Sequence, residues 1–332
     1  MSTLNIPAEE TAGRGWTAAI KDRVRQMLAF ASLIIIVAFF SFASPVFFTY
    51  SNITNVLFST VVIGTLAVGT TFVIITGGID LSIGTGMSLC AVMSAVFISH
   101  WGLPIWLGVI GAIVFGGLIG LVNGFNVSVL KIPPFIATLA MMLVAQGLAL
   151  VVSDSKPIYF TKDPGYVQIS IGSIIPGVDF PNAVLVLLVA VVISVVLLNR
   201  TILGRYTYAI GSNEEATALS GINVRRWKLA IYALGGLFIG LAGVLISARL
   251  ASAQPATGLG YELEAIAAVV IGGTSLTGGK GSIVGTVIGA LIISTINNGL
   301  QIMSIPQEWQ GVILGIVILI AVYADMIRKK EA

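Results

Sequence analysis

The sequence predicts an all-α, polytopic transmembrane helix bundle, and three observations support this. Of the 332 residues, 57% are hydrophobic and only 9% are charged, with a mean hydropathy of +1.02. Soluble domains typically carry about 25% charged residues, so a water-soluble globule could not cover this much apolar surface. Apolar runs recur between short polar breaks, most of them close to the roughly 20 residues that cross a bilayer. The basic residues gather in alternate breaks, as they do in membrane proteins of fixed orientation.

We predict ten spans, of which the third and the eighth are short and broken by glycine. Their ranges are 27–48, 54–76, 82–99, 103–124, 134–153, 182–199, 229–248, 262–275, 282–300 and 308–326. No small-residue cleavage site follows a short core in the first run, so we expect it to remain as a span. The chain then divides into a polar N-terminal segment (1–26), a transmembrane domain (27–326) and a tail (327–332).

The lysines and arginines set the expected orientation. With the N-terminus in the cytoplasm, fourteen of the 17 basic residues fall on the inner side and only Lys156, Lys162 and Arg249 on the outer side. The opposite orientation would invert this ratio and break the positive-inside rule. We therefore expect a multi-pass membrane protein with both termini in the cytoplasm.

Two connecting loops are long. The outer loop (154–181) contains four prolines and short alternating stretches, and is expected to form a short strand pair or a helix lying on the membrane. The inner loop (200–228) carries five basic residues and the pattern of a short amphipathic helix. These loops are the natural contact regions on the two sides of the membrane.

The sequence repeats weakly within itself. The stretch that begins Thr76-Gly77-Gly78 resembles the one that begins Ile271-Gly272-Gly273, and each follows an apolar run. A second similarity relates Asn123-Gly124 to Asn298-Gly299, at a different offset. Internal duplication is common in transporters, with the solute path between the halves. Chance similarity in glycine-rich apolar sequence is the competing explanation, and the sequence leaves open whether a repeat would be parallel or inverted.

The glycine-rich breaks are candidates for function. Glycine is unfavourable inside a helix, and backbone freed in the membrane must face protein or water. The breaks are therefore expected either to line a cavity or to let two helices pack closely. A carboxylate at this depth, Asp80, is unfavourable unless it is paired or hydrated. It is expected to cap the helix that starts near Leu81 or to contact a solute directly.

Amide side chains in the spans form a further group, because each can both donate and accept hydrogen bonds to a hydroxyl-rich molecule. Interhelical hydrogen bonding is the alternative role for any one of them. The group consists of Asn123, Asn126, Gln146, Asn297, Asn298, Gln301 and Gln310. With the breaks, this gives the candidates for a solute path: Gly77, Gly78, Asp80, Ser82, Asn123, Gly272, Gly273, Thr274, Asn297 and Asn298.

The inner loop contains the sharpest local pattern. Ser212 and Glu215 are three residues apart and predict a capping box at a helix start. The acidic pair Glu214 and Glu215 would lie in the first turn, where the helix dipole favours anions. Gly221 would close the helix in a left-handed cap. A free helix this short is marginal in water, so we expect it to dock on a partner, with the lipid headgroups as the alternative surface.

Several chemistries are excluded by what the sequence lacks. Lys280 follows two glycines, but a phosphate-binding loop requires a glycine where Thr274 stands and a hydroxyl residue where Gly281 stands. The single Cys90 and the single His100 provide no metal-ligand cluster and no disulfide. Scattered basic residues argue against nucleic acid as a ligand. No catalytic residue, metal or cofactor is therefore expected.

At this point the residues resemble a known family. Glu215-Ala216-Thr217 with Gly221 four residues later is similar to the EAA-type cytoplasmic loop of bacterial ABC importer permeases, with Thr217 where that family has alanine. More specifically, the chain resembles the ribose/xylose/arabinose-type sugar permeases, which are relatives of the branched-chain amino acid permeases. The matching stretches are residues 77–84, 211–222 and 261–276, and the resemblance runs from about residue 25 to the C-terminus.

The resemblance implies a homodimeric, non-catalytic permease that carries a monosaccharide or a related polyol. A cytoplasmic ATPase subunit would seat on the inner loops, and a periplasmic sugar-binding protein would dock outside. The ATPase-coupling residues would be Ser212, Asn213, Glu214, Glu215, Ala216 and Gly221. The competing class is an ion-coupled secondary sugar transporter, which usually needs paired ionisable residues within the membrane. Which sugar is carried is not encoded in any feature that we recognise.

Overall fold

The computed structural model describes residues 27, 29–174 and 180–330, and its fold is a bundle of apolar helices. Among the described residues, seven helices are long and apolar enough to cross a membrane. They are α2 (Tyr50–Ile75), α3 with its π-helical extension η1 (Ile83–His100), α4 (Ile105–Ser128), α5 (Pro134–Val152), α7 (Asn182–Arg200), α10 (Val224–Leu250) and α12 (Ile283–Ile302). The predicted all-α, polytopic class is confirmed.

The other three predicted spans correspond to helices with shorter apolar segments. They are Ala29–Ala43, α11 (Tyr261–Ile271) and α13 (Gln307–Lys330), whose apolar part covers Gln307–Ile320. The eleven residues of α11 rise only about 16 Å, which is half of a bilayer core. The predicted N-terminal segment (1–26) lies outside the described residues.

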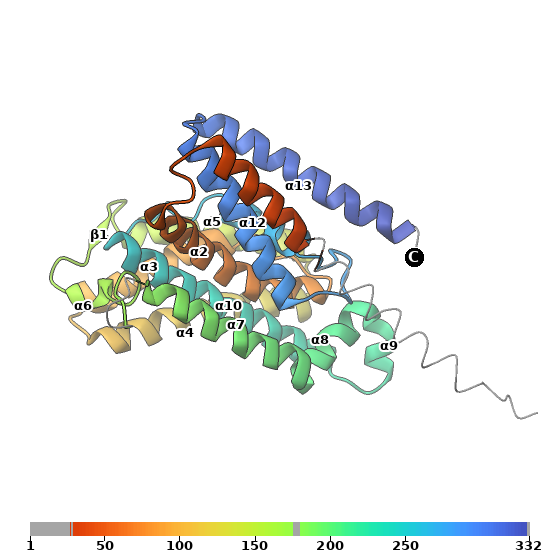
Figure 1. Ribbon diagram of the computed structural model, residues 1–332. Coiled ribbons are helices and arrows are strands. Elements are labelled where there is room, and N and C mark those ends of the chain that lie inside the picture. Colours follow the sequence, from red (N-terminus) through yellow and green to blue (C-terminus); the bar gives the residue numbers. More distant parts are fainter. Residues whose placement is uncertain (1–26, 28, 175–179, 331–332) are drawn as a thin grey trace, which may run out of the picture.

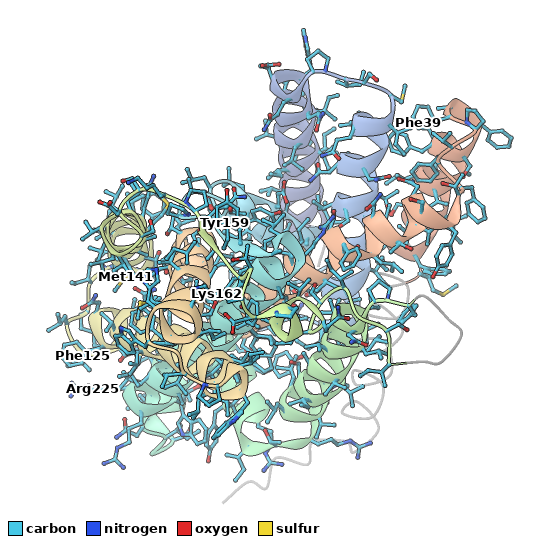
Figure 2. The ribbon with its side chains drawn as sticks, turned by 90° about the vertical axis from the view of Figure 1, so that its left-hand side faces the viewer. Phe39, Phe125, Met141, Tyr159, Lys162 and Arg225 are labelled. Atoms are coloured by element: carbon cyan, nitrogen blue, oxygen red, sulfur yellow. The ribbon has the colours of Figure 1, made fainter. Side chains whose placement is uncertain are left out.

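The helices at the centre of the bundle are α2, α3 and α10. Most of α2 is buried, whereas α4, α5 and α7 present large apolar side chains on their outer faces. Such exposure is expected where lipid, rather than water, surrounds the protein. Ala29–Ala43, α12 and α13 stand together at one side of the bundle, with Phe39 on their outer edge (Figure 2).

Glycines hold α4 and α10 together more closely than any aliphatic side chain would permit. Gly116 and Gly120 of α4 face Gly236 and Gly240 of α10, and a Cβ atom on any of them would collide with the backbone of the opposite helix. Small residues four apart are the usual means by which membrane helices approach closely. This contact fixes α4, and with it Asn123, against the centre of the bundle.

The described residues of the long loop, 154–174 and 180–181, are folded onto one end of the bundle. Its short strand β1 (Ile158–Tyr159) pairs antiparallel with β2 (Ser252–Ala253), which follows α10. Its short helix α6 (Pro164–Val167) inserts the fully buried Tyr166, whose hydroxyl bonds to Ser247 Oγ at 2.7 Å and Ser94 Oγ at 3.0 Å. The described part of the loop thus contributes one strand and one short helix, and the partner of that strand lies outside the loop, after α10.

Removing the hydroxyl of Tyr166 should loosen this loop without unfolding it. Ser94 and Ser247 each keep a bond to a backbone carbonyl of their own helix. We therefore expect Tyr166→Phe to lower stability by about 0.5–1.5 kcal/mol, the usual value of one hydrogen bond. Tyr159→Phe is the matched control, because Tyr159 is 60% exposed. Thermal unfolding of both variants in the same detergent would measure the difference; equal midpoints would contradict it.

The opposite end of the bundle carries α8 (Ile202–Ser212) and the short helix α9 (Glu214–Leu219). Figure 1 shows α8 and α9 at one end of the molecule and α6 and β1 at the other. The sequence similarity between the two glycine-rich breaks has a structural counterpart near α8. Gly77 follows α2 with φ +76° and Gly273 follows α11 with φ +90°. The amides of Gly77 and Gly273 bond to the carbonyls three residues earlier, and the next amides to the carbonyls five residues earlier, as in a Schellman cap.

By their place in the two caps, Gly77 corresponds to Gly273. The sequence similarity instead paired Gly77 with Gly272, so the two alignments differ by one residue. The second similarity has no such counterpart. Asn123 bonds to Asp80, just beyond the end of α2, whereas Asn298 bonds to Asn52 at the start of α2. The two asparagines therefore lie at opposite ends of the bundle.

Candidate coupling and translocation sites

The candidate coupling element is the pair of helices α8 and α9. The side chain of Asn213 accepts a hydrogen bond from the Ala216 amide at 2.9 Å and begins α9. The predicted capping box with Ser212 is therefore wrong. Its physical reason is that α8 continues through Ser212, so the first extended residue before α9 is Asn213, at φ −160°. Gly221 has φ +83° and ends the turn after α9 in the predicted left-handed conformation.

The outer face of α9 is exposed and mixed in character. Glu214, Glu215 and Ala216 are exposed, and Leu219 is 84% exposed, an unusual position for leucine outside the lipid region. Glu214 forms an ion pair with Lys228 of α10 at 2.5 Å, which ties α9 to the bundle. The buried Thr217 bonds to the Asn213 carbonyl at 2.7 Å. An exposed apolar side chain on a fixed helix that also carries two carboxylates is suited to a protein partner.

The end of α8 packs directly against both glycine-rich breaks. A Cβ atom on Gly211 would collide with the carbonyl of Ile75 and the amide of Gly279. That amide donates to the Ile75 carbonyl at 2.9 Å, so the two breaks are bonded to each other. The hydroxyl of Tyr208 also donates to the Gly281 carbonyl at 2.8 Å. We call Ile75, Tyr208, Gly211, Gly279 and Gly281 the glycine joint.

Three of the candidates for the solute path meet in one buried cluster. Asp80 Oδ1 accepts from the Ser82 amide at 2.9 Å and from the Ser82 hydroxyl at 2.6 Å. Asn123 Nδ2 donates to Asp80 Oδ2 at 3.2 Å and to Ser82 Oγ at 2.8 Å. All three side chains are buried, and α3 begins immediately afterwards at Ile83. This geometry is an Asx turn before α3, tied to α4 by Asn123. The expected capping role of Asp80 is wrong, because α3 begins two residues after Leu81 and its N-cap Ser82 makes no side-chain capping bond.

The remaining candidates are dispersed. Gly78 faces the hydroxyl of Tyr232, and Gly272 lies against the backbone of Gly285 in α12, so both are sites of close packing. Thr274 is fully buried, and its hydroxyl has no hydrogen-bond partner among the described residues. Asn298 donates to Asn52 Oδ1 at 2.8 Å, which is an interhelical hydrogen bond between α12 and α2.

Asn297 lies on the other side of α12, in a polar cavity that the sequence did not reveal. Its amide donates to Glu264 Oε1 at 3.0 Å. The cavity has a volume of about 230 Å³ and is lined by Glu264, Asn297, Gln301, Gln307 and Gln310, with Gly311 and Leu314. Glu264 lies near the start of the predicted span 262–275, but the helix formed there, α11, is so short that it begins inside the bundle. The signal in the sequence was the recurrence of amides in the last two spans.

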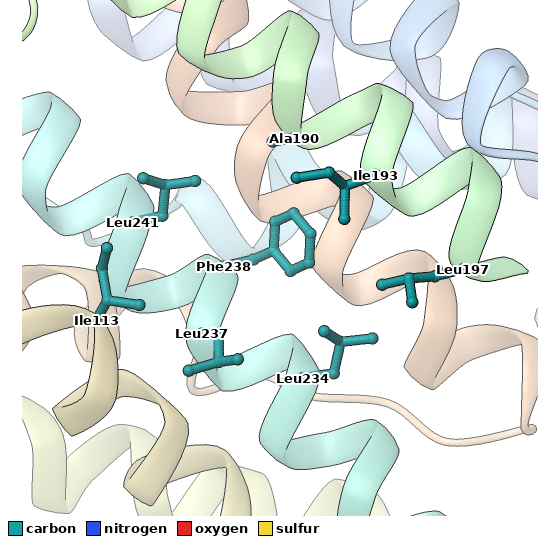
Figure 3. Close-up of a pocket in the computed structure, with 8 residues that line it drawn as sticks. All are labelled: Ile113, Ala190, Ile193, Leu197, Leu234, Leu237, Phe238 and Leu241. Atoms are coloured by element: carbon teal, nitrogen blue, oxygen red, sulfur yellow. The ribbon is translucent and has the colours of Figure 1, made fainter. Parts of the chain in front are cut away.

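A second pocket of about 210 Å³ lies between α4, α7 and α10 and is entirely apolar. Figure 3 shows Phe238 and Leu234 of α10 facing Ile193 and Leu197 of α7 across it. It offers no hydrogen-bonding group to a hydrated solute. An acyl chain is the chemistry that it suits.

The fold and these sites define a multi-pass helical membrane protein with a compact helical element at one end.

A family model described as branched-chain amino acid transport system / permease component matches residues 52–322. The chain belongs to this family, and the resemblance drawn from its residues is confirmed. No solved structure gives a significant match.

The chain is also similar to several permeases. The ribose import permease protein RbsC of Escherichia coli K12 is 45% identical over 336 residues and is matched over 100% of both chains. The protein of the same name from Bacillus subtilis is 47% identical, over 94% of this chain and 95% of its own. The xylose transport system permease protein XylH of Haemophilus influenzae is 36% identical, over 90% and 96% of the two chains.

Proposed function

We propose that this chain is the permease subunit of a binding-protein-dependent ABC importer that carries a monosaccharide or a related polyol across the bacterial inner membrane. The observation that carries this proposal is the match to ribose import permeases over the whole chain. A separate ATPase subunit would hydrolyse ATP, and this chain would supply the path. A second copy would complete that path as a homodimer.

The orientation follows from charge. Arg200, Arg205, Arg225, Arg226 and Lys228 flank α8 and α9, and basic residues favour the cytoplasmic side. The glycine joint, Asp80 and Lys280 would then lie toward the cytoplasm. The elements α6 and β1 of the long loop lie at the opposite end of the bundle and would face the periplasm (Figure 1). Because β1, β2 and Tyr166 hold this part of the loop in place, it would offer a preformed surface to a sugar-binding protein.

The helix α9 would be the element that the ATPase grips. Its exposed Leu219 and its carboxylates protrude from the bundle, and its base is fastened by Glu214 and Lys228. The end of α8, which leads into α9, packs on both glycine-rich breaks at Ile75 and Gly279. A movement of α9 would therefore reach the segments before α3 and α12 through this packing and the bond from Tyr208 to Gly281, as a rigid two-state element requires.

The proposed function is tested by uptake in proteoliposomes. The permease, its ATPase and the sugar-binding protein are reconstituted together, with radiolabelled D-ribose or D-xylose outside. We expect uptake that depends on ATP inside the vesicle and is absent with proton or sodium gradients alone. Uptake by the permease alone, driven by an ion gradient, would instead establish the secondary transporter.

Two substitutions on α9 test the partner surface. We expect Leu219→Glu to place a charge in an apolar pocket of the ATPase and to weaken binding by about 2 kcal/mol or more, the usual loss at a central interface residue. Glu215→Arg should also reduce co-purification of the ATPase. Leu259→Glu is the control, because Leu259 is 50% exposed but lies after β2, away from α9. Undiminished co-purification with both α9 variants would remove the coupling role of this helix.

A further inference from the structure

The polar cavity exists because the chain enters the bundle before it forms α11. After β2, residues 254–260 run alongside α3, and the amide of Gly258 donates to the Ser88 hydroxyl at 2.7 Å. Only then does α11 begin, so its first turn lies beside the first turns of α3, where Glu262 approaches Gly84. Discontinuous helices of this kind form solute sites in many transporters, because their ends place polar groups within the membrane.

Glu264 lies in that first turn, and no cation among the described residues pairs with it. Its one hydrogen-bond partner among the described residues is Asn297, at 3.0 Å. Neither of the two ion pairs between described residues involves it. An acidic side chain within the membrane is unfavourable and usually serves a function. Packing does not require a carboxylate here, since a glutamine would make the same bond to Asn297.

The other polar residues that line the cavity all carry amide side chains. Asn297 and Gln301 come from the last turns of α12, and Gln307 and Gln310 from the first turns of α13. Gln310 donates to the Ile305 carbonyl at 2.7 Å, whereas Gln301 and Gln307 make no side-chain hydrogen bond to another described residue. Amide side chains left without partners next to a carboxylate can donate to and accept from several hydroxyl groups at once.

The residues that line the cavity also indicate which solutes would not bind there. The described lining contains no lysine, arginine or histidine to hold a carboxylate or phosphate. The single charge is negative and would repel an anion. A neutral molecule with several hydroxyl groups can donate to Glu264 and exchange both kinds of hydrogen bond with the amides. The apolar pocket between α4, α7 and α10 has similar volume and none of these groups, so cavity size alone does not single out the site.

We propose that the cavity between α11, α12 and α13 is the place within the membrane where the hydroxyl groups of the transported sugar are held, with Glu264 and Gln301 as its main contacts. This inference rests on the proposed function and adds a location and a mode of recognition to it. It moves the solute site away from the buried Asp80 cluster, where Asp80, Ser82 and Asn123 already bond to one another.

The test compares two cavity variants, Glu264→Gln and Gln301→Leu, with a control, Gln146→Leu. The control also replaces an amide in a membrane span, but Gln146 lies on α5, outside the cavity. The complete importer is reconstituted, and uptake of D-ribose and D-xylose is measured together with ATP hydrolysis stimulated by the binding protein. We expect the cavity variants to lower the maximal uptake rate by about two- to tenfold each, the range for one hydrogen bond. ATP hydrolysis should be unchanged, and the control should transport normally.

A labelling experiment gives an independent readout. Cys90 is buried and is replaced by alanine, which leaves no other cysteine in the chain. A cysteine introduced by Gln301→Cys is then reacted with a maleimide while the importer hydrolyses ATP and transports. D-ribose or D-xylose, supplied with the binding protein, should slow the labelling, and L-leucine should not.

The outcomes separate the two proposals. If the unmodified importer takes up no sugar with ATP, the proposed function fails. If it transports sugar and both cavity variants transport at the normal rate with unprotected labelling of Gln301→Cys, the cavity is overturned and the function stands. Protection by L-leucine as strongly as by sugar would also overturn the assignment to a neutral polyol.

Discussion

Gly211→Ala should strongly weaken the coupling of ATP hydrolysis to uptake while the permease remains folded. One methyl group on Gly211 would overlap the Ile75 carbonyl and the Gly279 amide, neither of which belongs to a flexible side chain. Relief requires the end of α8 to move away from both breaks. We expect the coupling free energy to fall by about 1–3 kcal/mol, which is a loss of about 5- to 150-fold in the uptake obtained per ATP hydrolysed.

The controls for this variant address folding and partner binding separately. Gly315→Ala adds the same methyl group to α13, where no atom lies within 4 Å. The exposed face of α9 is unchanged in Gly211→Ala, so the ATPase should still co-purify and hydrolyse ATP. Uptake equal to that of Gly315→Ala, with a monodisperse protein, would show that the glycine joint does not transmit movement.

Much of this architecture could be predicted, because membrane helices are recognisable in a sequence as long apolar runs. Each of the ten predicted spans overlaps a helix, and the boundaries of α5 and α7 agree within one residue. The cap of α9 was misplaced because Ser212 and Asn213 are both good capping residues. Which of them begins the helix depends on how far α8 continues, and Tyr208 and Gly211 hold α8 against the breaks. A local pattern does not contain that tertiary contact.

The candidate sites were harder to predict, since they depend on pairs of residues far apart in the chain. Glu264 and Asn297 are 33 residues apart, and their contact requires α11 to begin within the bundle. Asn297 and Asn298 are adjacent in sequence but point to different neighbours, Glu264 and Asn52. Periodicity identifies the amides in α12 but gives no way to decide which one borders a cavity.

Gly120→Leu should prevent the bundle from forming, the largest effect on stability that we expect. Gly120 of α4 lies against the Tyr232 carbonyl and the Cα atom of Gly236 in α10, so a leucine side chain has no direction in which to relax. Overpacking of a core usually costs about 1–3 kcal/mol, and we expect the backbone collision here to exceed that range. Separation of α4 from α10 would also withdraw Asn123 from Asp80 and Ser82, which leaves a buried carboxylate with fewer donors.

Gly147→Leu is the matched control for this prediction. It makes the same change in the apolar helix α5, at a glycine with no atom within 4 Å. Because that position faces outward, the added side chain should be accommodated by lipid, and the variant should keep the yield and melting temperature of the unmodified protein. Gly120→Leu should yield aggregated protein, and Gly120→Ala a folded protein with a lower melting temperature in detergent. If Gly120→Leu were as stable as Gly147→Leu, the close crossing of α4 and α10 would not be what holds the centre of this bundle together.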